Sequence, residues 1–397
     1  MSPVAGADPA SKTEPNTVVP GGASPAKVVS ARAKATAFSI GLFVSFGLAE
    51  AAMRLPGIPR PLDLENYVGS CYERDASDPI LRYDTRFDVY LPRVHVTTRC
   101  AFNGYVWRHR SDQLGFRNPR DVSRADVAVL GDSMVYGHGV EESDTAAALL
   151  RRRYAGGVAN LGVVGASPVH SLLFVRNGVN RLNAHVVVVF FYRNDILDIR
   201  RARTEVEVRR FVETGDAREA RTLREPLSDD SYGPGSARLV RLASRSAAFR
   251  ALRFGYLVQS SRSTNSLSRR PRMRRNDPLI RAYLERSIIE MHGTLASSGR
   301  SLVVATMPTS LPPQSNGAHA TARIVEDEVH RVAVERGIPY FDPSERFRLA
   351  SGRPDPRAFL RRDFHLSREG HRRLSDALDE FLVSNHVAVG RTTRDTP

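Results

Sequence analysis

The sequence predicts an α/β fold built on a parallel sheet, and two observations carry that prediction. Short runs rich in Val, at 125–130, 157–162, 185–191 and 301–306, are bounded by Gly and polar residues, which is typical of strands buried on both faces. Segments of helical character separate these runs. Because strands that alternate with helices form a doubly wound sheet, we expect a parallel sheet with helices on both of its faces.

The remaining elements follow the same alternation. A short strand is expected at 338–341, and the expected helices span 142–154, 167–181, 278–297, 318–336 and 367–384. One long interruption, 196–277, does not fit the pattern. It is basic, and a helix expected near Arg238 to Ala247 has Arg on one face and apolar residues on the other. This insertion is a lid, a helix on a membrane surface, or a surface helix packed on its own domain.

The first strand ends in Gly131-Asp132-Ser133, where the chain passes from strand to helix. This is the carboxyl edge of the sheet, where open α/β folds place ligands. The backbone N–H of a serine there lies near a helix N-terminus, which stabilises developing negative charge. A plain turn capped by Ser133 explains the same residues. The motif alone therefore does not decide between catalysis and capping.

Three further polar blocks follow this one. The second is Asn160-Leu161-Gly162-Val163-Val164-Gly165-Ala166-Ser167, the third is Arg193-Asn194-Asp195, and the last is Asp363-Phe364-His365. Over roughly residues 125 to 385, the four blocks in this order resemble the SGNH hydrolases, also called GDSL esterases and lipases. The resemblance implies the flavodoxin-like, three-layer α/β/α form of the doubly wound sheet. It also implies a serine hydrolase that needs no cofactor or metal.

Ester hydrolysis by a serine requires a base, a group that orients the base, and donors to the oxyanion. The resemblance assigns the nucleophile to Ser133, the base to His365 and the orienting carboxylate to Asp363. The oxyanion donors are expected to be the backbone N–H groups of Ser133 and Gly165 and the side-chain amide of Asn194. Glycine lets its N–H approach a substrate closely, and a neutral amide stabilises an oxyanion without competing for the proton.

Two departures from the family pattern bear on these roles. Tyr192 stands where the third block usually has Gly. The last block has one residue between Asp363 and His365 where the family usually has two, so Arg362 occupies the usual Asp position. Asp355 or a backbone carbonyl is therefore an alternative partner for the base.

Three other residues near the blocks receive no role in the chemistry. Asp132 is expected to brace the loop beside the nucleophile. His138 lies between two glycines and is expected in a flexible loop, and His371 is expected to be structural.

The N-terminal region predicts a membrane anchor. Residues 1–34 are rich in Pro, Ala, Gly, Ser and Thr and are expected to be a disordered tail. Residues 35–53 are apolar and long enough to span a bilayer. Lys27, Arg32 and Lys34 precede them, which favours a cytoplasmic N-terminus and an extracytoplasmic catalytic domain, periplasmic or extracellular. A cleaved signal peptide ending near Ala49-Glu50-Ala51 is the alternative.

Residues 54–124 are expected to be an extracytoplasmic lead-in with short strands, and 386–397 a flexible tail. Leu114-Gly115-Phe116-Arg117-Asn118 resembles the segment that precedes Gly-Asp-Ser in membrane-anchored members of the family. Cys71 and Cys100, the two cysteines of the chain, lie after the apolar segment. They form a disulfide or remain two thiols.

The chain carries 58 Lys and Arg against 43 Asp and Glu, a formal charge of +15. The arginines are dispersed and no nucleic-acid motif is present, so we expect no nucleic-acid partner. The expected function is hydrolysis of acyl esters, acetyl esters among them, on an envelope glycan or lipid. The alternatives are an O-acyltransferase that modifies envelope polysaccharide and a non-catalytic module that binds an anionic polymer.

Overall fold

The computed structural model describes residues 30–52, 54–55, 81–85, 89–102, 105–196, 205–216, 246, 248, 278–310, 318–361 and 363–387. The chain divides into two compact units, Met1–Leu55 and Pro56–Pro397. Residues 1–29, the helix expected near Arg238 to Ala247, the residues from 388 onward and Cys71 lie outside the described residues.

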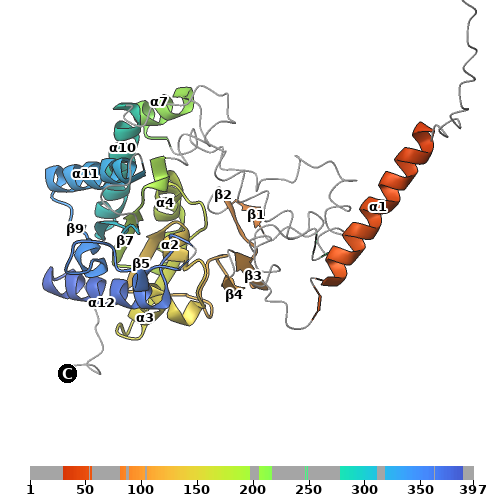
Figure 1. Ribbon diagram of the computed structural model, residues 1–397. Helices are drawn as coiled ribbons and strands as arrows, with labels where there is room; N and C mark the ends of the chain where they lie inside the picture. Colours follow the sequence, from red (N-terminus) through yellow and green to blue (C-terminus); the bar gives the residue numbers. More distant parts are fainter. Residues whose placement is uncertain are drawn as a thin grey trace, which may run out of the picture. The chain divides into compact units, whose positions relative to one another are not determined.

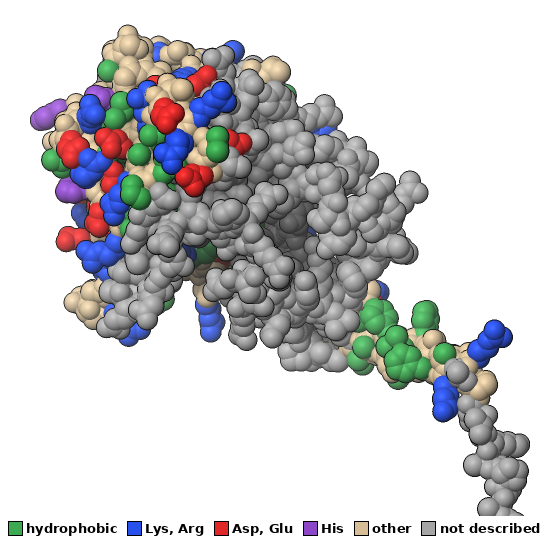
Figure 2. Space-filling model, turned by 90° about the horizontal axis from the view of Figure 1, so that it is seen from above, with side chains coloured by type: hydrophobic (Ala, Val, Ile, Leu, Met, Phe, Trp, Pro, Cys, Tyr) green, Lys and Arg blue, Asp and Glu red, His purple; other side chains and the backbone are tan. Residues whose placement is uncertain are grey.

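The first unit contains one long helix, α1 (Ala31–Ala52). Residues 32–52 of this helix are long and apolar enough to cross a membrane, and none of that segment is buried within the protein. Its large apolar side chains are exposed (Figure 2), with Phe43 at 84% and Phe38 at 73%. A membrane span and a signal sequence both have these properties.

The second unit is organised around a five-stranded parallel sheet. Its strands lie in the order β6-β5-β7-β8-β9, so the first strand of the sheet in the sequence pairs with the second and the third. This is the flavodoxin-like order, and the α/β fold expected from the sequence is confirmed. The strands are β5 (Val127–Gly131), β6 (Val158–Gly162), β7 (Val186–Phe191), β8 (Ser301–Thr306) and β9 (Tyr340–Phe341).

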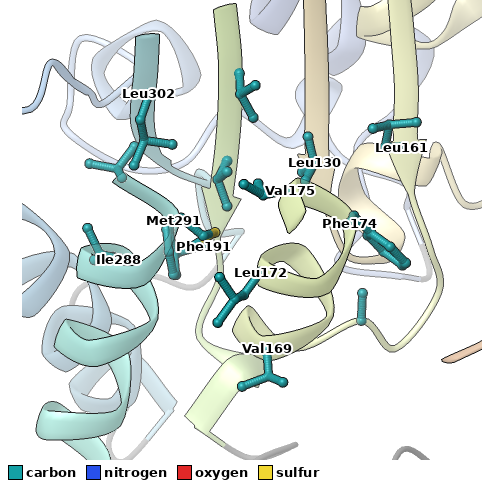
Figure 3. Packing of buried hydrophobic residues seen from close by; sticks show 14 of the residues in the cluster. Leu130, Leu161, Val169, Leu172, Phe174, Val175, Phe191, Ile288, Met291 and Leu302 are labelled. Atoms are coloured by element: carbon teal, nitrogen blue, oxygen red, sulfur yellow. The ribbon is translucent and has the colours of Figure 1, made fainter. Parts of the chain in front are cut away.

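Helices cover both faces of the sheet, which gives three layers (Figure 1). In β5, Ala128 and Leu130 point to one face and Val127 and Val129 to the other, because successive side chains of a strand alternate. Figure 3 shows the first face, where Leu130 lies near Leu172 and the other helix residues of that core. The helices on this face are α4 (Pro168–Phe174), α5 (Asn180–Leu182), α10 (Pro278–Ala296) and α11 (Ala318–Arg336), and those on the other are α3 (Ala146–Arg151) and α12 (Arg368–Ser384).

Two expected helices are interrupted. The helix expected at 142–154 begins as a 3-10 turn, Glu142–Asp144, and becomes α3 only after Thr145, whose hydroxyl accepts a hydrogen bond from the N–H of Ala148. The helix expected at 167–181 contains a π-helical turn, Val175–Val179, between α4 and α5. Further short 3-10 turns among the described residues are Ser344–Phe347 and Pro356–Ala358. The helix α7 (Glu205–Thr214) packs against α10.

Two antiparallel hairpins precede the sheet. They pair β1 (Leu81–Asp84) with β2 (Val89–Pro92), and β3 (Thr97–Phe102) with β4 (Tyr105–Arg110). In β4 the buried side chains, Trp107 and His109, alternate with exposed ones. Cys100 of β3 is disulfide-bonded and packs with Trp107 and Tyr136. The hairpin therefore contacts the segment that directly follows Ser133.

Candidate active site

The site lies where the sheet reverses its order. β5 runs between β6 and β7, and all three strands end at the same edge because they are parallel. Ser133 follows β5, Gly165 follows β6 and Asn194 follows β7. In open α/β sheets this switch point leaves a crevice at the carboxyl ends of the strands.

The structure brings Ser133, His365 and Asp363 into one hydrogen-bonded line. His365 Nε2 lies 2.7 Å from Ser133 Oγ, and His365 Nδ1 lies 2.8 Å from Asp363 Oδ1. The side chains of the histidine and the aspartate are 5% and 1% exposed. With Asp363 ionised, the proton of the imidazole is on Nδ1, and this N–H donates a hydrogen bond to the carboxylate. Nε2 therefore accepts a hydrogen bond from the serine hydroxyl.

A tight turn explains how a spacing of one residue suffices. The N–H of Asp363 donates to the carbonyl of Leu360, and the N–H of Leu360 donates to the carbonyl of His365. Asp363 Oδ1 also accepts the N–H of Phe364, at 2.7 Å, which holds the carboxylate on the side of the imidazole. Asp355, the alternative partner, is bound to arginines instead: Arg357 holds the pKa of its carboxyl well below the usual range.

The three expected oxyanion donors lie at the ends of neighbouring strands. Ser133 is the first residue of the short helix α2 (Ser133–Tyr136), and Gly165 has a φ of 76° that favours glycine. Within the described part of the chain, neither backbone N–H is used in a hydrogen bond. The side-chain amide of Asn194 donates a hydrogen bond to Asp132 Oδ2, at 2.8 Å.

Asp132 links the nucleophile loop to Asn194. Its second oxygen accepts the N–H of Met134, at 2.9 Å, and so caps α2. Burial raises the pKa of this carboxyl, while the bonds from Met134 and Asn194 and the nearby His365 oppose that rise. The expectation of a bracing role agrees with these contacts.

Two glycines let β5 and β6 press against α2. A Cβ on Gly162 would lie 2.4 Å from the backbone nitrogen of Tyr136, and one on Gly131 would lie 2.6 Å from Val135 Cγ2. Asn160 adds a hydrogen bond from its amide to the carbonyl of Val135. The glycines in these two blocks are therefore required for close packing behind the nucleophile.

Arg117 also holds the segment that follows Ser133, a role that its sequence motif alone does not reveal. Its side chain is fully buried and donates to the carbonyls of Tyr136, Gly137, Arg108 and Val140 at 2.7 to 3.2 Å. The guanidinium carbon also lies 4.8 Å from the centre of the Tyr136 ring. The resemblance of residues 114–118 to a family segment was the available signal.

His138 is buried and does not lie in a flexible loop, contrary to expectation. The positive φ angles of Gly137 and Gly139 turn the chain so that the ring enters the core, where it is 4% exposed. It stacks on His365 with ring centres 4.5 Å apart, and it packs at a tilt against Trp107, with ring centres 4.6 Å apart. Burial first, and then the charge of His365, lower the pKa of His138 to about 3, so this ring is neutral at pH 7.

One group of side chains has the composition of a metal site. The ligand atoms of His138, Asp363 and His365 lie within 4.8 Å of one another. Both ring nitrogens of His365 are already hydrogen-bonded, to Ser133 and to Asp363. A metal bound here would have to replace one of those bonds, so the arrangement fits proton transfer better than metal binding.

Aromatic residues continue from the base toward the surface. Phe364 stacks on His365 with ring centres 4.4 Å apart and on Tyr192 at 6.0 Å. Arg193 lies over both Tyr192 and Phe364, with its guanidinium carbon 5.4 Å from each ring centre. Tyr192, the departure from the family's usual glycine, thus forms part of a stacked group beside the base.

Known proteins resemble this chain in sequence profile and in fold. Residues 129–373 match the profile of the GDSL-like Lipase/Acylhydrolase family. No curated protein sequence matches the chain. Similar solved structures include a member of the lipolytic G-D-S-L family from Veillonella parvula, at 12% identity and a TM-score of 0.37, over 64% of this chain and 96% of that one. Others are a catalytic mutant of an acetylxylan esterase from Geobacillus stearothermophilus (12%, 0.37, 64% and 93%) and an α/β hydrolase from the Lake Arreo metagenome (14%, 0.38, 66% and 97%).

Proposed function

Because this chain belongs to the GDSL-like lipase/acylhydrolase family of serine hydrolases, we propose that it cleaves acyl esters, acetyl esters among them, on an envelope glycan or lipid. Ser133, His365 and Asp363 carry out the reaction. The contact of 2.7 Å between Ser133 Oγ and His365 Nε2 is the observation that supports this most directly. The base is held in line by Asp363, 2.8 Å from its other nitrogen.

The first half of the reaction forms an acyl-enzyme. Ser133 Oγ attacks the ester carbonyl as its proton moves to His365 Nε2. Asp363 stabilises the imidazolium that results. When the tetrahedral intermediate collapses, the ester C–O bond breaks and the leaving alcohol takes the proton from Nε2.

The second half releases the acyl group. Water attacks the acyl carbonyl and gives a proton to Nε2, which then returns it to Ser133 Oγ as the carboxylic acid leaves. In both halves the oxyanion is stabilised by the N–H groups of Ser133 and Gly165 and by the side-chain amide of Asn194. Asp132, through its bond to Asn194, fixes the direction of that amide.

We further propose that α1 anchors the enzyme in the cell membrane with the catalytic domain outside the cytoplasm. The apolar length of Arg32–Ala52 and the preceding Lys27 support this orientation. A reporter enzyme that works only outside the cytoplasm should then be active when it is fused after Pro397, and one that works only in the cytoplasm should be inactive. A mature protein that begins near Met53 would instead identify a cleaved signal.

The function is tested with the full-length protein in detergent and 4-nitrophenyl acetate as substrate. Hydrolysis should fall by about 10⁴-fold or more in Ser133→Ala, since the nucleophile and the base act as one unit. Ser143→Ala, which changes an exposed serine, is the matched control and should retain full activity. Equal activity in wild type and Ser133→Ala would refute the assignment. Acetyl transfer to an added sugar without acetate release would identify a transferase instead.

A further inference from the structure

The guanidinium of Arg193 lies at the site and makes few hydrogen bonds within the protein. Its Nε donates to Tyr192 Oη at 3.0 Å. Within the part of the chain that the structure describes, this is its one hydrogen bond, and no carboxylate lies within ion-pair distance. The two Nη groups therefore keep their donors for another molecule.

This state contrasts with that of arginines elsewhere on the surface. Arg331 bonds to three glutamates, and Arg153 pairs with Asp376 and Asp379. In Figure 2, basic and acidic side chains are interspersed over the described part of the visible face. An anion from outside would supply the acidic partner that Arg193 lacks among the described residues.

Packing ties the position of Arg193 to the reacting atoms. The guanidinium contacts the Phe364 ring, that ring stacks on His365, and His365 bonds to Ser133. The next residue after Arg193 is Asn194, whose amide bonds to Asp132 beside the nucleophile. A ligand on the Nη groups therefore lies close to an ester bound at Ser133.

The shape and charge of the Arg193 guanidinium, together with the neighbouring Phe364 ring, favour one class of anion. The two parallel N–H donors of a planar guanidinium match the oxygens of a carboxylate or a phosphate, and the single positive charge of Arg193 balances the single negative charge of a carboxylate. Phe364, 36% exposed, offers an apolar surface next to it. An acidic sugar offers both groups that this surface can bind, a carboxylate for Arg193 and a face of ring C–H groups for Phe364.

We propose that Arg193, positioned by Tyr192 and Phe364, is a substrate-binding residue for the carboxylate of a uronic acid, so that the enzyme acts on O-acetylated acidic glycans. This assignment rests on the proposed esterase function and names its substrate class. Because the ion pair forms in the bound substrate and persists in the transition state, it should affect KM more than kcat.

The test measures acetate release by the full-length protein from two matched substrates, O-acetylated oligogalacturonide and the same oligosaccharide with its carboxylates methyl-esterified. The wild type should prefer the free acid by about 10- to 100-fold in kcat/KM. Arg193→Gln should abolish that preference through a higher KM for the free acid. Arg336→Gln is the control, because it removes the same charge far from the site. Arg336 ends α11 and precedes β9, so it lies at the edge of the sheet opposite to the site.

Two results would overturn the assignment. One is an equal loss of kcat/KM on both substrates in Arg193→Gln, and the other is a wild-type enzyme that prefers an acetylated sugar phosphate to the uronate. A second arm keeps the test independent of turnover. In Ser133→Ala, calorimetry should detect binding of unacetylated oligogalacturonide, and adding Arg193→Gln should weaken it at least about 10-fold. If the wild type cleaves no ester, including 4-nitrophenyl acetate, the proposed function fails, while this binding measurement still decides the role of Arg193.

Discussion

Arg117 and Arg193 both lie over a tyrosine ring next to the site, yet they differ in what their guanidinium groups bond to. Arg117 is fully buried and donates to four backbone carbonyls, two of them at the end of α2. Arg193 is partly exposed and makes one hydrogen bond, to Tyr192 Oη. The first side chain holds the backbone that presents Ser133, and the second has donors left for a ligand.

The comparison shows that position near a site does not assign a role. A buried charge is tolerated only when fixed polar groups surround it, so removing it leaves those groups without partners. A charge at the rim costs little to remove from the folded state. The two arginines should therefore separate stability from substrate binding.

The largest expected effect is on stability. Arg117→Leu should lower the free energy of unfolding by about 3–5 kcal/mol, because four carbonyls lose their donor and three of these hydrogen bonds are buried. Arg193→Leu should change it by less than about 0.5 kcal/mol. Thermal unfolding of the two full-length variants in detergent measures both. Similar losses would contradict the distinction, and a partly recovered Arg117→Lys would show that charge matters more than the forked geometry.

A second prediction separates Arg193 from the residue beside it. Asn194→Ala should lower kcat on 4-nitrophenyl acetate by about 10²–10³-fold with a small change in KM, because its donor acts mainly when charge develops on the oxyanion. Arg193→Gln should leave this neutral substrate unchanged. Steady-state kinetics of both variants provides the measurement. An Asn194→Ala variant that changes KM alone would argue for a binding role like that of its neighbour.

The smallest effect concerns pH. Burial, assisted by the charge of Arg117, lowers the pKa of His109, His138 and His371 to about 3. In the unfolded chain these histidines bind a proton near pH 6.5. The stability that the folded chain has with the three rings neutral is therefore fully present above that pH and is lost as the pH falls toward 3. Each histidine should reduce stability by roughly 2 kcal/mol between pH 7 and pH 5.

His371→Asn tests this directly. An asparagine oxygen can replace the ring nitrogen that accepts the N–H of Ala146 but does not titrate. The fall in unfolding temperature from pH 7 to pH 5 should therefore be smaller than in the wild type. His386→Asn, at an exposed position, should leave that fall unchanged. No difference between the two variants would show that burial of His371 is not coupled to acid unfolding.

The strands and the location of the site could be predicted because their signals are local. Buried parallel strands are runs of apolar residues, and Ser133, Gly165 and Asn194 follow such runs directly. The helix boundaries at 142–154 and 167–181 were less predictable, since a cap at Thr145 and a π-helical turn depend on details within one turn. The helices themselves remained visible from their apolar spacing.

By itself, the sequence determined the α/β fold, its strand segments, the family and the residues expected to act together, since periodicity and short motifs are properties of neighbouring residues. Only the tertiary structure decided how polar side chains are shared between distant segments. It buried His138 against His365, placed Asp363 and not Asp355 on the base, and gave Arg117 and Arg193 different surroundings. The physical reason is that burial and hydrogen bonding depend on which segments meet in space, and segments more than two hundred residues apart, as at Ser133 and His365, meet only in the folded chain.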